Sequence, residues 1–454
     1  MSQIMTGSNT DLASVTAEAE ARYVAANPES KRRHDAAVAH MPGGNTRTVL
    51  FYSPFPLVLK GGQGCRIEDV DGHGYADYLG EYTAGLYGHS DPVLQAALHK
   101  AVDDGFALGG HNMYEAELAA EMCRRFPSVE RVRFCNSGTE GNLFAISAAR
   151  LHTGRSTVMV FHGAYHGGVF YFGQQKSPIN APFPWIIGHY NDIDSTLALI
   201  NKNAPELAAV LIEPMMGAAG GIPADQEFLK AIRSACSRLG IVLIFDEVMT
   251  SRLSSGGLQK KLGVTPDLTS FGKYLGGGAS FGGFGGRADI MDRFDPRRPD
   301  GVGHAGTFNN NVFSMAAGLA GLTKIYTDEA ADKLTADGDA LRERINGLAQ
   351  KHKLPLQAKG VGSIMGLHFH DGPINRPQDV WTRDAVHAGR IADLQKLLHL
   401  DLLAQGQYMA RRGFISLSLP MTAEDHDKFC AAIDEFLSVR GPVISAATAA
   451  PTAA

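Results

Sequence analysis

Short apolar runs alternate with helical patterns through the middle of the chain. Each run is bounded by polar or glycine-rich residues, as expected for strands that are buried on both faces of a mostly parallel sheet. The expected strands are 131–134, 157–161, 208–212, 241–245 and 268–271. Because the segments between them, such as 226–239, have helical spacing, the pattern predicts a doubly wound α/β domain.

The pattern changes toward both ends of the chain. Near the start, helices are expected over 11–26 and 34–39, and three short runs within 58–79 predict an antiparallel meander. After residue 337 a long helix over 341–352, a strand near 364–369, further helices and a last strand predict a small α+β domain. That last strand is expected at 415–419.

These patterns divide the chain into four parts. The last residues are rich in alanine, threonine and proline and are expected to be disordered. The parts are an N-terminal segment (1–74) that packs with the small domain, a large domain (75–335), a small domain (336–440) and a tail (441–454).

Composition and charge narrow the class of protein. The chain is 44% hydrophobic and 20% charged, and its net charge of −5 comes without a basic stripe, which argues against nucleic acid as a partner. No apolar run reaches the roughly 18 residues of a membrane span. Five scattered cysteines without a CxxC pair, and no apolar leader, fit a reducing compartment, so a cytoplasmic location is expected.

Ligands of such sheets bind beyond the carboxyl ends of the strands, so the polar residues that follow each strand are the candidates. Lys273 follows the strand at 268–271 among glycines; burial would lower its pKa and leave a nucleophilic amine, although a surface turn is the simpler alternative. Asp246 and Glu247 end the strand at 241–245. A buried carboxylate needs a partner, such as a protonated ring nitrogen, but a structural acid or a metal ligand is also possible.

The segment 137–140, Ser-Gly-Thr-Glu, follows the first of these strands and opens an apparent helix. Its N–H groups and the helix dipole would favour a phosphate, although Ser137 and Glu140 also fit a capping box. Tyr165 follows the strand at 157–161 and could stack on a flat ring. His162 and His166 have the spacing of a zinc pair on a helix, but the glycines around them indicate a loop.

Three further signals are weaker. The run 283–288 formally matches GxGxxA but lacks the acidic residue of a nicotinamide site. The polar turn at 306–309 precedes an alanine-rich segment and fits a helix start. Arg47 and Arg412 could each clamp a carboxylate with two hydrogen bonds, although either could be an ordinary surface arginine.

Taken in order, these motifs resemble the class III aminotransferases of pyridoxal 5'-phosphate (PLP) fold type I. The likeness covers roughly residues 40–435. It implies a large domain with a mostly parallel, seven-stranded sheet and a smaller α+β domain. The motifs that carry it are Asn136–Glu140, Tyr165–Gly167, Glu213–Pro214, Asp246–Thr250, Gly272–Lys273 and Gly306–Thr307.

Within the family the chain is similar to bacterial members that act on β-phenylalanine, through 41–51, 81–85, 307–311 and 412–414. Glutamate-1-semialdehyde aminomutases look like more distant relatives. This likeness implies an aromatic β-amino acid as the amine donor and an α-keto acid, such as 2-oxoglutarate or pyruvate, as the acceptor.

The resemblance also implies roles for individual residues. Lys273 would hold PLP and shuttle a proton, and Asp246 would pair with the ring nitrogen. Thr307 would reach the phosphate of a neighbouring subunit, which implies a homodimer with the active site at its interface. The other cofactor contacts implied are Ser137, Gly138, Thr139, Tyr165, Glu213, Val248 and Met249, and the substrate contacts are Arg47, Tyr82 and Arg412.

In these roles Arg47 would bind the carboxylate of the β-amino acid and Arg412 that of the keto acid, although the adjacent Arg411 leaves open which arginine faces the pocket. Alternatives to a two-substrate transaminase are an aminomutase, a transaminase of other ω-amines, and a non-catalytic binding protein on the same fold. An intact Lys273 and Asp246, and no spare length for a DNA-binding domain, argue against the last.

Overall fold

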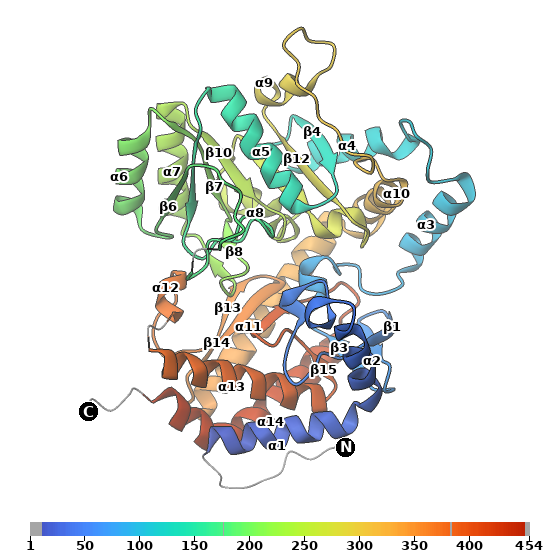
Figure 1. The fold of residues 1–454 in the computed structure, drawn as a ribbon, viewed down its shortest axis with the longest axis vertical. Helices are drawn as coiled ribbons and strands as arrows, with labels where there is room; N and C mark the ends of the chain where they lie inside the picture. The colour runs from blue at the N-terminus through green and yellow to red at the C-terminus, as the bar shows by residue number, and fades with distance from the viewer. Residues whose placement is uncertain (1–10, 176, 382–383, 450–454) are drawn as a thin grey trace.

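The computed structural model describes residues 11–175, 177–381 and 384–449. They form two lobes stacked along the long axis of the molecule, with the large sheet in one lobe and both chain ends at the other (Figure 1). The large sheet has seven strands, and only β12 runs antiparallel to its neighbours. In spatial order the strands are β4 (Arg131–Cys135), β12 (Gly282–Gly286), β11 (Leu268–Gly272), β10 (Val242–Asp246), β7 (Leu207–Ile212), β5 (Thr157–Phe161) and β6 (Trp185–Gly188).

The strands β5, β7, β10 and β11 are buried along their whole length, because helices cover the sheet. This is why each appears in the sequence as a continuous apolar run. The expected architecture, a seven-stranded, mostly parallel sheet with a smaller α+β domain, is confirmed. The helices of this lobe are α3 (Pro92–Asp104), α4 (Met113–Arg125), α5 (Gly138–Thr153), α6 (Ile193–Asn203), α7 (Gln226–Leu239), α8 (Gly257–Leu262), α9 (Ala288–Met291) and α10 (Val312–Ala320).

The strand β12 was not expected, because four of its five residues are glycines, which are poor strand formers. Its bare backbone lies against its neighbours and against α5. A Cβ on Gly141 of α5 would lie 2.6 Å from the carbonyl oxygen of Gly283, so the helix touches the strand backbone directly. The GxGxxA match in this stretch therefore belongs to a strand of the sheet.

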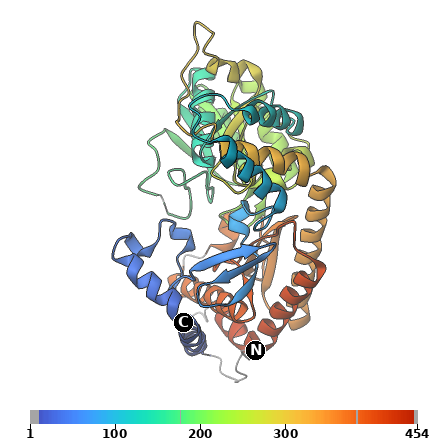
Figure 2. The ribbon, with the colours of Figure 1, turned by 90° about the vertical axis from the view of Figure 1, so that its right-hand side faces the viewer.

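The second lobe contains a four-stranded and a three-stranded sheet, flanked by long helices (Figure 2). Helix α1 packs on α13, and α14 packs on both α11 and α13. The strands are β1 (Leu59–Gln63), β2 (Arg66–Asp69), β3 (Gly74–Asp77) and β15 (Gln407–Tyr408), then β13 (Leu356–Val361), β14 (Ile364–Phe369) and β16 (Phe414–Ser416). The helices are α1 (Leu12–Ala26), α2 (Pro28–Val38), α11 (Asp328–His352), α12 (Pro377–Val380), α13 (Ala385–Ala404) and α14 (Ala423–Thr448).

Two lobe boundaries differ from those expected at residues 74 and 335. The strand β3 completes the N-terminal meander and pairs in parallel with β15, with Ala76 opposite Gln407. Helix α11 begins at Asp328, well before the residue 341 at which the long helix was expected. Pairing between segments far apart in the chain decided the first boundary, and local apolar spacing does not contain that information.

The disordered tail expected over 441–454 is wrong for its first part. Helix α14 continues to Thr448, and Val443, Ile444 and Ala447 are buried in the small lobe. These apolar residues lie on one face of the helix, and their burial outweighs the alanine-rich composition and Pro442. Residues 450–454 lie outside the described part of the chain.

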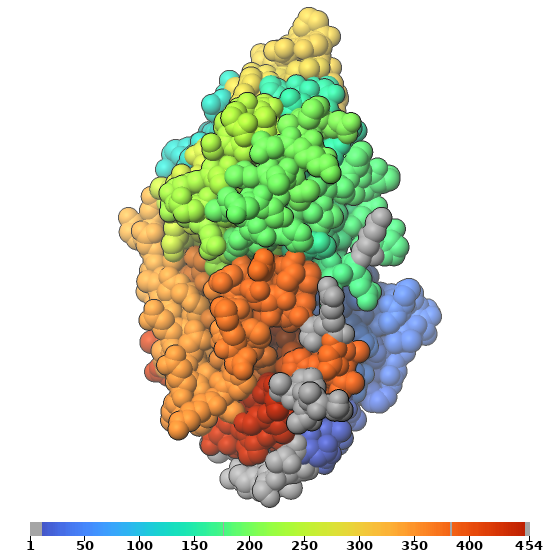
Figure 3. All heavy atoms as spheres, turned by 90° about the vertical axis from the view of Figure 1, so that its left-hand side faces the viewer, coloured from blue at the N-terminus to red at the C-terminus, as the bar shows by residue number. Residues whose placement is uncertain are grey.

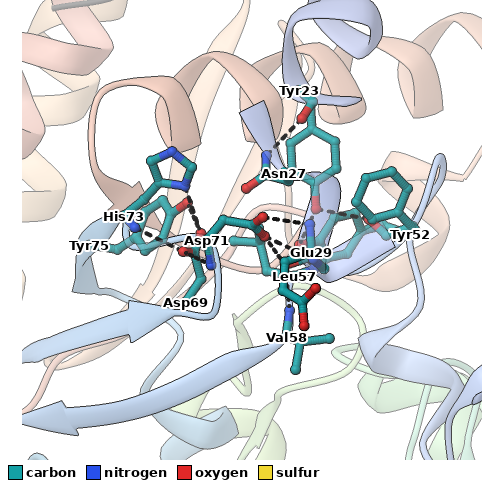
Figure 4. A network of polar contacts seen from close by, with 12 residues as sticks. Tyr23, Asn27, Glu29, Tyr52, Leu57, Val58, Asp69, Asp71, His73 and Tyr75 are labelled. Carbon is teal, nitrogen blue, oxygen red and sulfur yellow. Dashed lines mark hydrogen bonds and ion pairs between the residues drawn. The ribbon is translucent and has the colours of Figure 1, made fainter. Parts of the chain in front are cut away.

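The N-terminal helices are fixed to the meander by a network of polar contacts (Figure 4). The carboxylate of Asp71 accepts hydrogen bonds from the backbone N–H groups of Glu29 and Ser30, at 2.7 and 2.9 Å, and so caps the start of α2. The hydroxyl of Tyr23 donates to the carbonyl of Phe55 at 2.9 Å. The N-terminal segment therefore belongs structurally to the small lobe.

The lobes meet over a broad contact, where the green surface of the large lobe sits directly on the orange surface of the small one (Figure 3). Behind this face, Nε2 of His368 lies 2.8 Å from the carbonyl oxygen of Gly220, and Asn191 donates to the carbonyl of Asn375 at 2.6 Å. Within the described residues, no helix combines the length and the apolar character that crossing a membrane requires.

The end of α14 offers a test of the small-lobe core. Replacing the fully buried Ile444 with alanine is expected to lower the free energy of unfolding by about 2–4 kcal/mol, because a cavity replaces packed methyl groups. Urea denaturation followed by circular dichroism measures the change. The exposed neighbour Ser445 provides the control, since Ser445→Ala should change stability by less than about 0.5 kcal/mol. Equal midpoints for the two variants would contradict the packing of this helix.

Candidate active site

A cavity of about 500 Å³ opens at the carboxyl ends of β10 and β11. This is the edge at which ligands bind in open α/β sheets. Ten of the site residues expected from the sequence line this cavity. They are Arg47, Ser137, Gly138, Thr139, Tyr165, Glu213, Asp246, Val248, Met249 and Lys273.

Lys273 stands directly after β11 and begins a short 3₁₀ turn, Lys273–Gly276. Its backbone is left-handed, with φ of 58°, a conformation that costs a non-glycine residue about 1–2 kcal/mol. The side chain keeps partial access to solvent through the cavity, yet protein atoms crowd its amine on most sides. Burial, followed by the positive charge of Arg47, lowers the pKa of Lys273 to about 8. A substantial fraction of the amine is therefore neutral near neutral pH and can act as a nucleophile.

Asp246 ends β10 with its carboxylate buried and held from three sides. One oxygen accepts a hydrogen bond from Nδ2 of Asn142 at 2.8 Å and lies 2.8 Å from Nδ1 of His166. The other accepts from the backbone N–H of Val248 at 3.0 Å. Asn142 is itself fixed by Ser270, whose hydroxyl donates to its side-chain oxygen at 2.6 Å. Asn142 was not expected at the site from the sequence, although its polar side chain among the apolar positions of α5 was a usable signal.

Glu247, the acid that follows Asp246 in the sequence, is bound to a different part of the protein. Glu247 accepts hydrogen bonds from the backbone N–H groups of Leu258 and Gln259, at 2.7 and 3.0 Å, and from the hydroxyl of Thr250. These contacts fix the start of α8, so Glu247 is a structural acid. His166, considered with His162 for a zinc site, is turned toward Asp246 instead.

The N-terminus of α5 forms one wall of the cavity. Ser137 caps the helix, with its hydroxyl accepting a hydrogen bond from the backbone N–H of Glu140 at 3.2 Å, so the capping interpretation holds for Ser137. The first turn of a helix also carries N–H groups without intrahelical partners and the positive end of the dipole. A Cβ on Gly138 would lie 2.6 Å from a methyl carbon of Val248. The chain therefore comes close at this point and leaves backbone, rather than side chains, facing a ligand.

Tyr165 presents a half-exposed ring to the same cavity. Its backbone N–H donates to Glu213 at 2.9 Å, and the N–H of Gly217 donates to the other carboxylate oxygen at 2.9 Å. Burial raises the pKa of Glu213 to about 7, while the nearby His166 acts in the opposite direction. Glu213 thus ties the loop that carries Tyr165 to the end of β7.

The ring of Tyr82 lies close to both candidate arginines. The guanidinium carbon of Arg412 is 5.3 Å from the centre of its ring, and that of Arg47 is 6.0 Å away. Arg412 also donates to the carbonyl of Ala218 at 3.0 Å. Arg411 lies near the buried His399, on whose pKa its positive charge acts in the same direction as burial, whereas Arg412 lies over Tyr82. Arg412 lines a second cavity of about 420 Å³. Gly217 also lines this second cavity, and its N–H donates to Glu213 of the first.

Three expected residues, Tyr82, Thr307 and Arg412, do not line the cavity that contains Lys273. Thr307 is exposed and does not line it, and neither does the exposed Phe308 beside it. The turn is nevertheless tied to the start of α5, because Nδ2 of Asn136 donates to the side-chain oxygen of Asn309 at 3.1 Å. Within one subunit, Thr307 therefore faces outward.

The turn that carries Tyr82 has an unusual backbone, which the sequence did not reveal. Gly80, Glu81, Tyr82 and Thr83 all have positive φ, at 53°, 46°, 50° and 83°. For the three non-glycine residues this costs roughly 1–2 kcal/mol each. Such strain persists only where the surroundings hold the backbone in place. Here the Asp77 carboxylate accepts from two backbone N–H groups at 3.0 Å, those of Leu79 and Gly80.

A buried amine of lowered pKa, a fixed carboxylate, a helix N-terminus and an aromatic ring around one cavity are the parts of a PLP site. The model of the class III aminotransferase family matches residues 51–427, and the chain belongs to this family. It is therefore a PLP-dependent transaminase.

Its relatives make the likeness more specific. The chain is 49% identical over 428 residues to the β-phenylalanine transaminase of Variovorax paradoxus, which covers 94% of this chain and 97% of that protein. The crystal structure of the β-phenylalanine aminotransferase from this organism matches 96% of the chain and 99% of its own, with a TM-score of 0.93 and 47% identity.

The chain also resembles solved structures of lower sequence identity. An omega-transaminase from Sphaerobacter thermophilus is 34% identical, covers 91% of this chain and 98% of its own, and has a TM-score of 0.85. A glutamate-1-semialdehyde aminomutase from Pseudomonas aeruginosa, at 22% identity, covers 94% of this chain and 98% of its own with a TM-score of 0.86. At that identity the aminomutase shows a shared fold alone.

The electrostatics of Lys273 can be tested without a cofactor. In the cofactor-free protein, the rate of acylation at Lys273 should rise with pH through about 8. In Arg47→Ala this profile should move to higher pH, because the loss of a nearby positive charge stabilises the ammonium. Mass spectrometry of the labelled peptide measures the rate. Arg297→Ala, with an exposed side chain far from the cavity, is the control, and equal profiles for all three proteins would disprove the coupling.

Proposed function

We propose that this transaminase transfers the amino group of a β-amino acid, aromatic and similar to β-phenylalanine, to an α-keto acid such as 2-oxoglutarate or pyruvate. The main support is the pair of arginines, Arg47 and Arg412, near the ring of Tyr82. Arg47 lines the cavity that contains Lys273, and Arg412 lines the second cavity. Two separate cationic groups suit two carboxylate substrates that use one site in turn. The 49% identity to a β-phenylalanine transaminase supports the choice of donor.

The residues of the cavity fit PLP, which, when bound, accepts the amino group and takes up the electron pair left on the substrate carbon. In this proposal Lys273 binds the cofactor aldehyde through its Nζ atom. Once the donor has displaced it, the same amine carries the proton from the substrate carbon. Asp246 keeps the ring nitrogen protonated, and the hydrogen bonds from Asn142 and Val248 keep that carboxylate in place.

The remaining contacts divide between phosphate and ring. The first turn of α5, Ser137, Gly138 and Thr139, binds the phosphate, because its N–H groups and dipole favour an anion. We assign the stacking contact to Tyr165. Glu213, Val248 and Met249 complete the cofactor-binding set.

We further propose a homodimer in which Thr307 of one subunit contacts the phosphate site of the other. Thr307 faces away from the cavity of its own subunit, which supports this assignment. Exposed apolar side chains in the same lobe, Phe106, Leu108, Met113 and Phe308, also support burial by a second copy. A cytoplasmic location is supported by five cysteines that all remain free thiols.

Two alternatives differ in what the enzyme consumes. An aminomutase would need no external keto acid, whereas a transaminase of uncarboxylated amines would not need Arg47. The 34% identity to an omega-transaminase is the observation that favours the second alternative, a transaminase of uncarboxylated amines. Turnover of amine donors with and without a carboxylate, in the presence and absence of 2-oxoglutarate, separates all three activities.

Replacing Lys273 with alanine should remove both the covalent attachment and the proton carrier. We expect turnover to fall by at least about 10²–10⁴-fold. Borohydride reduction of the protein mixed with PLP should then give no covalent adduct at position 273 by mass spectrometry. Lys202→Ala, an exposed lysine on α6, should keep both properties. Normal turnover by the Lys273 variant would rule out the assignment.

Replacing Arg412 with alanine should raise the KM for keto acids by about 10- to 100-fold, since a charged hydrogen-bonded contact to the carboxylate is lost. Steady-state kinetics with 2-oxoglutarate and pyruvate measure this change. The KM for an uncarboxylated amine donor serves as an internal control and should stay near the wild-type value. An unaltered KM for both keto acids would show that Arg412 does not bind the acceptor.

A further inference from the structure

Arg47 is already paired with an acid in the cavity. Its Nη1 atom contacts the Oε1 atom of Glu81 in an ion pair, and both residues line the cavity that contains Lys273. The carboxylate of Glu81 therefore lies against the guanidinium that the carboxylate of a β-amino acid would need. Arg412 differs, because the group it donates to is the neutral carbonyl of Ala218.

The position of Glu81 is imposed by its backbone. Glu81 and Tyr82 have φ/ψ of 46°/42° and 50°/49°, which place both residues in the left-handed helical region. The turn is held from both sides. Arg252 donates to the carbonyl of Thr83 at 3.1 Å, and Gly80 packs so closely on Ser416 that a Cβ there would lie 2.9 Å from its carbonyl oxygen. The Glu81 side chain is thus directed by a fixed turn, unlike an acid on a mobile surface loop.

The ion pair also lies within electrostatic range of the reacting amine. Arg47 lowers the pKa of Lys273 and Glu81 raises it, so the two members of the pair act on the amine in opposite directions. Both side chains are accessible, at 42% for Arg47 and 52% for Glu81. Ion pairs at this exposure are weak, and a competing carboxylate can separate them.

We propose that Glu81 is an internal counter-ion of Arg47, which the carboxylate of the amine donor must displace, and that Glu81 thereby sets the preference between carboxylated and uncarboxylated donors. This inference rests on the proposed function, in which Arg47 binds the donor carboxylate. When a donor lacks a carboxylate, the ion pair between Arg47 and Glu81 stays intact, and this part of the cavity carries no net charge. When a donor carries one, Arg47 exchanges one anionic partner for another.

Removing the negative charge of Glu81 should have opposite effects on the two kinds of donor. In Glu81→Gln, Arg47 is free for the substrate, so the KM for β-phenylalanine should fall about two- to five-fold, the range expected for loss of a weak competing ion pair. The KM for 1-phenylethylamine should not fall, because an uncompensated Arg47 repels a cationic amine. Glu81→Asn should behave in the same way, and asparagine suits the left-handed backbone should glutamine disturb the turn.

Binding to the cofactor-free protein gives a second, independent measurement. The probe is 3-phenylpropanoate, which has the carboxylate but no amino group, and its affinity is measured by titration calorimetry. It should bind about two- to five-fold more tightly to Glu81→Gln than to the wild type. It should bind weakly to Arg47→Ala, and addition of Glu81→Gln to Arg47→Ala should change nothing further. Glu68→Gln, which breaks the exposed pair with Lys60 outside the cavity, is the matched control and should equal the wild type.

The outcomes separate the two proposals. If Arg47→Ala binds the probe as tightly as the wild type, Arg47 does not bind the donor carboxylate and that part of the proposed function fails. If Arg47→Ala loses the probe while Glu81→Gln, Glu81→Asn and Glu68→Gln all match the wild type, the counter-ion role of Glu81 is overturned and the proposed function stands.

Discussion

The arrangement of this candidate active site depends on holding one carboxylate in a fixed position inside the protein. Burial of an isolated carboxylate is unfavourable unless several donors compensate for the lost water. Asn142 and the backbone N–H of Val248 donate to Asp246, and Nδ1 of His166 lies 2.8 Å from it, so three different segments surround this carboxylate. These segments meet because a parallel sheet brings the carboxyl ends of its strands to a common edge. The same edge places Lys273 in the cavity one strand away, since β10 and β11 are neighbours.

The parts of the fold that the sequence predicted are those governed by local burial. The strands β5, β7, β10 and β11 are apolar throughout because both of their faces are covered. By contrast, β12 consists almost entirely of glycine, and only contact with its neighbours makes it a strand. The helical conformation at the end of α14 was also not predicted. It depends on the burial of a few residues within an alanine-rich segment.

The residues of the candidate site also divide into those that the sequence could identify and those that it could not. Residues directly after a strand, such as Asp246 and Lys273, could be identified because the topology fixes where a strand end must lie. Asn142 gave only a weak signal, as a polar residue among the apolar positions of a helix, because its partner Asp246 is distant in sequence. Glu81 could not be identified, since its contact with Arg47 depends on a distant partner and a left-handed backbone. The sequence favoured Arg412 but left open whether Arg411 or Arg412 faces the pocket. In the structure Arg412 lies over Tyr82, and Arg411 lies near the buried His399.

The contact between α5 and β12 has a consequence for how this protein tolerates change. Because Gly141 rests directly on the backbone at Gly283, the spacing between helix and sheet depends on the missing side chain of Gly141. Even a methyl group at position 141 would push the helix outward, and the helix start, with Ser137 and Gly138, would move with it. Substitutions at this glycine contact can therefore shift the first turn of α5, the segment to which we assign phosphate binding.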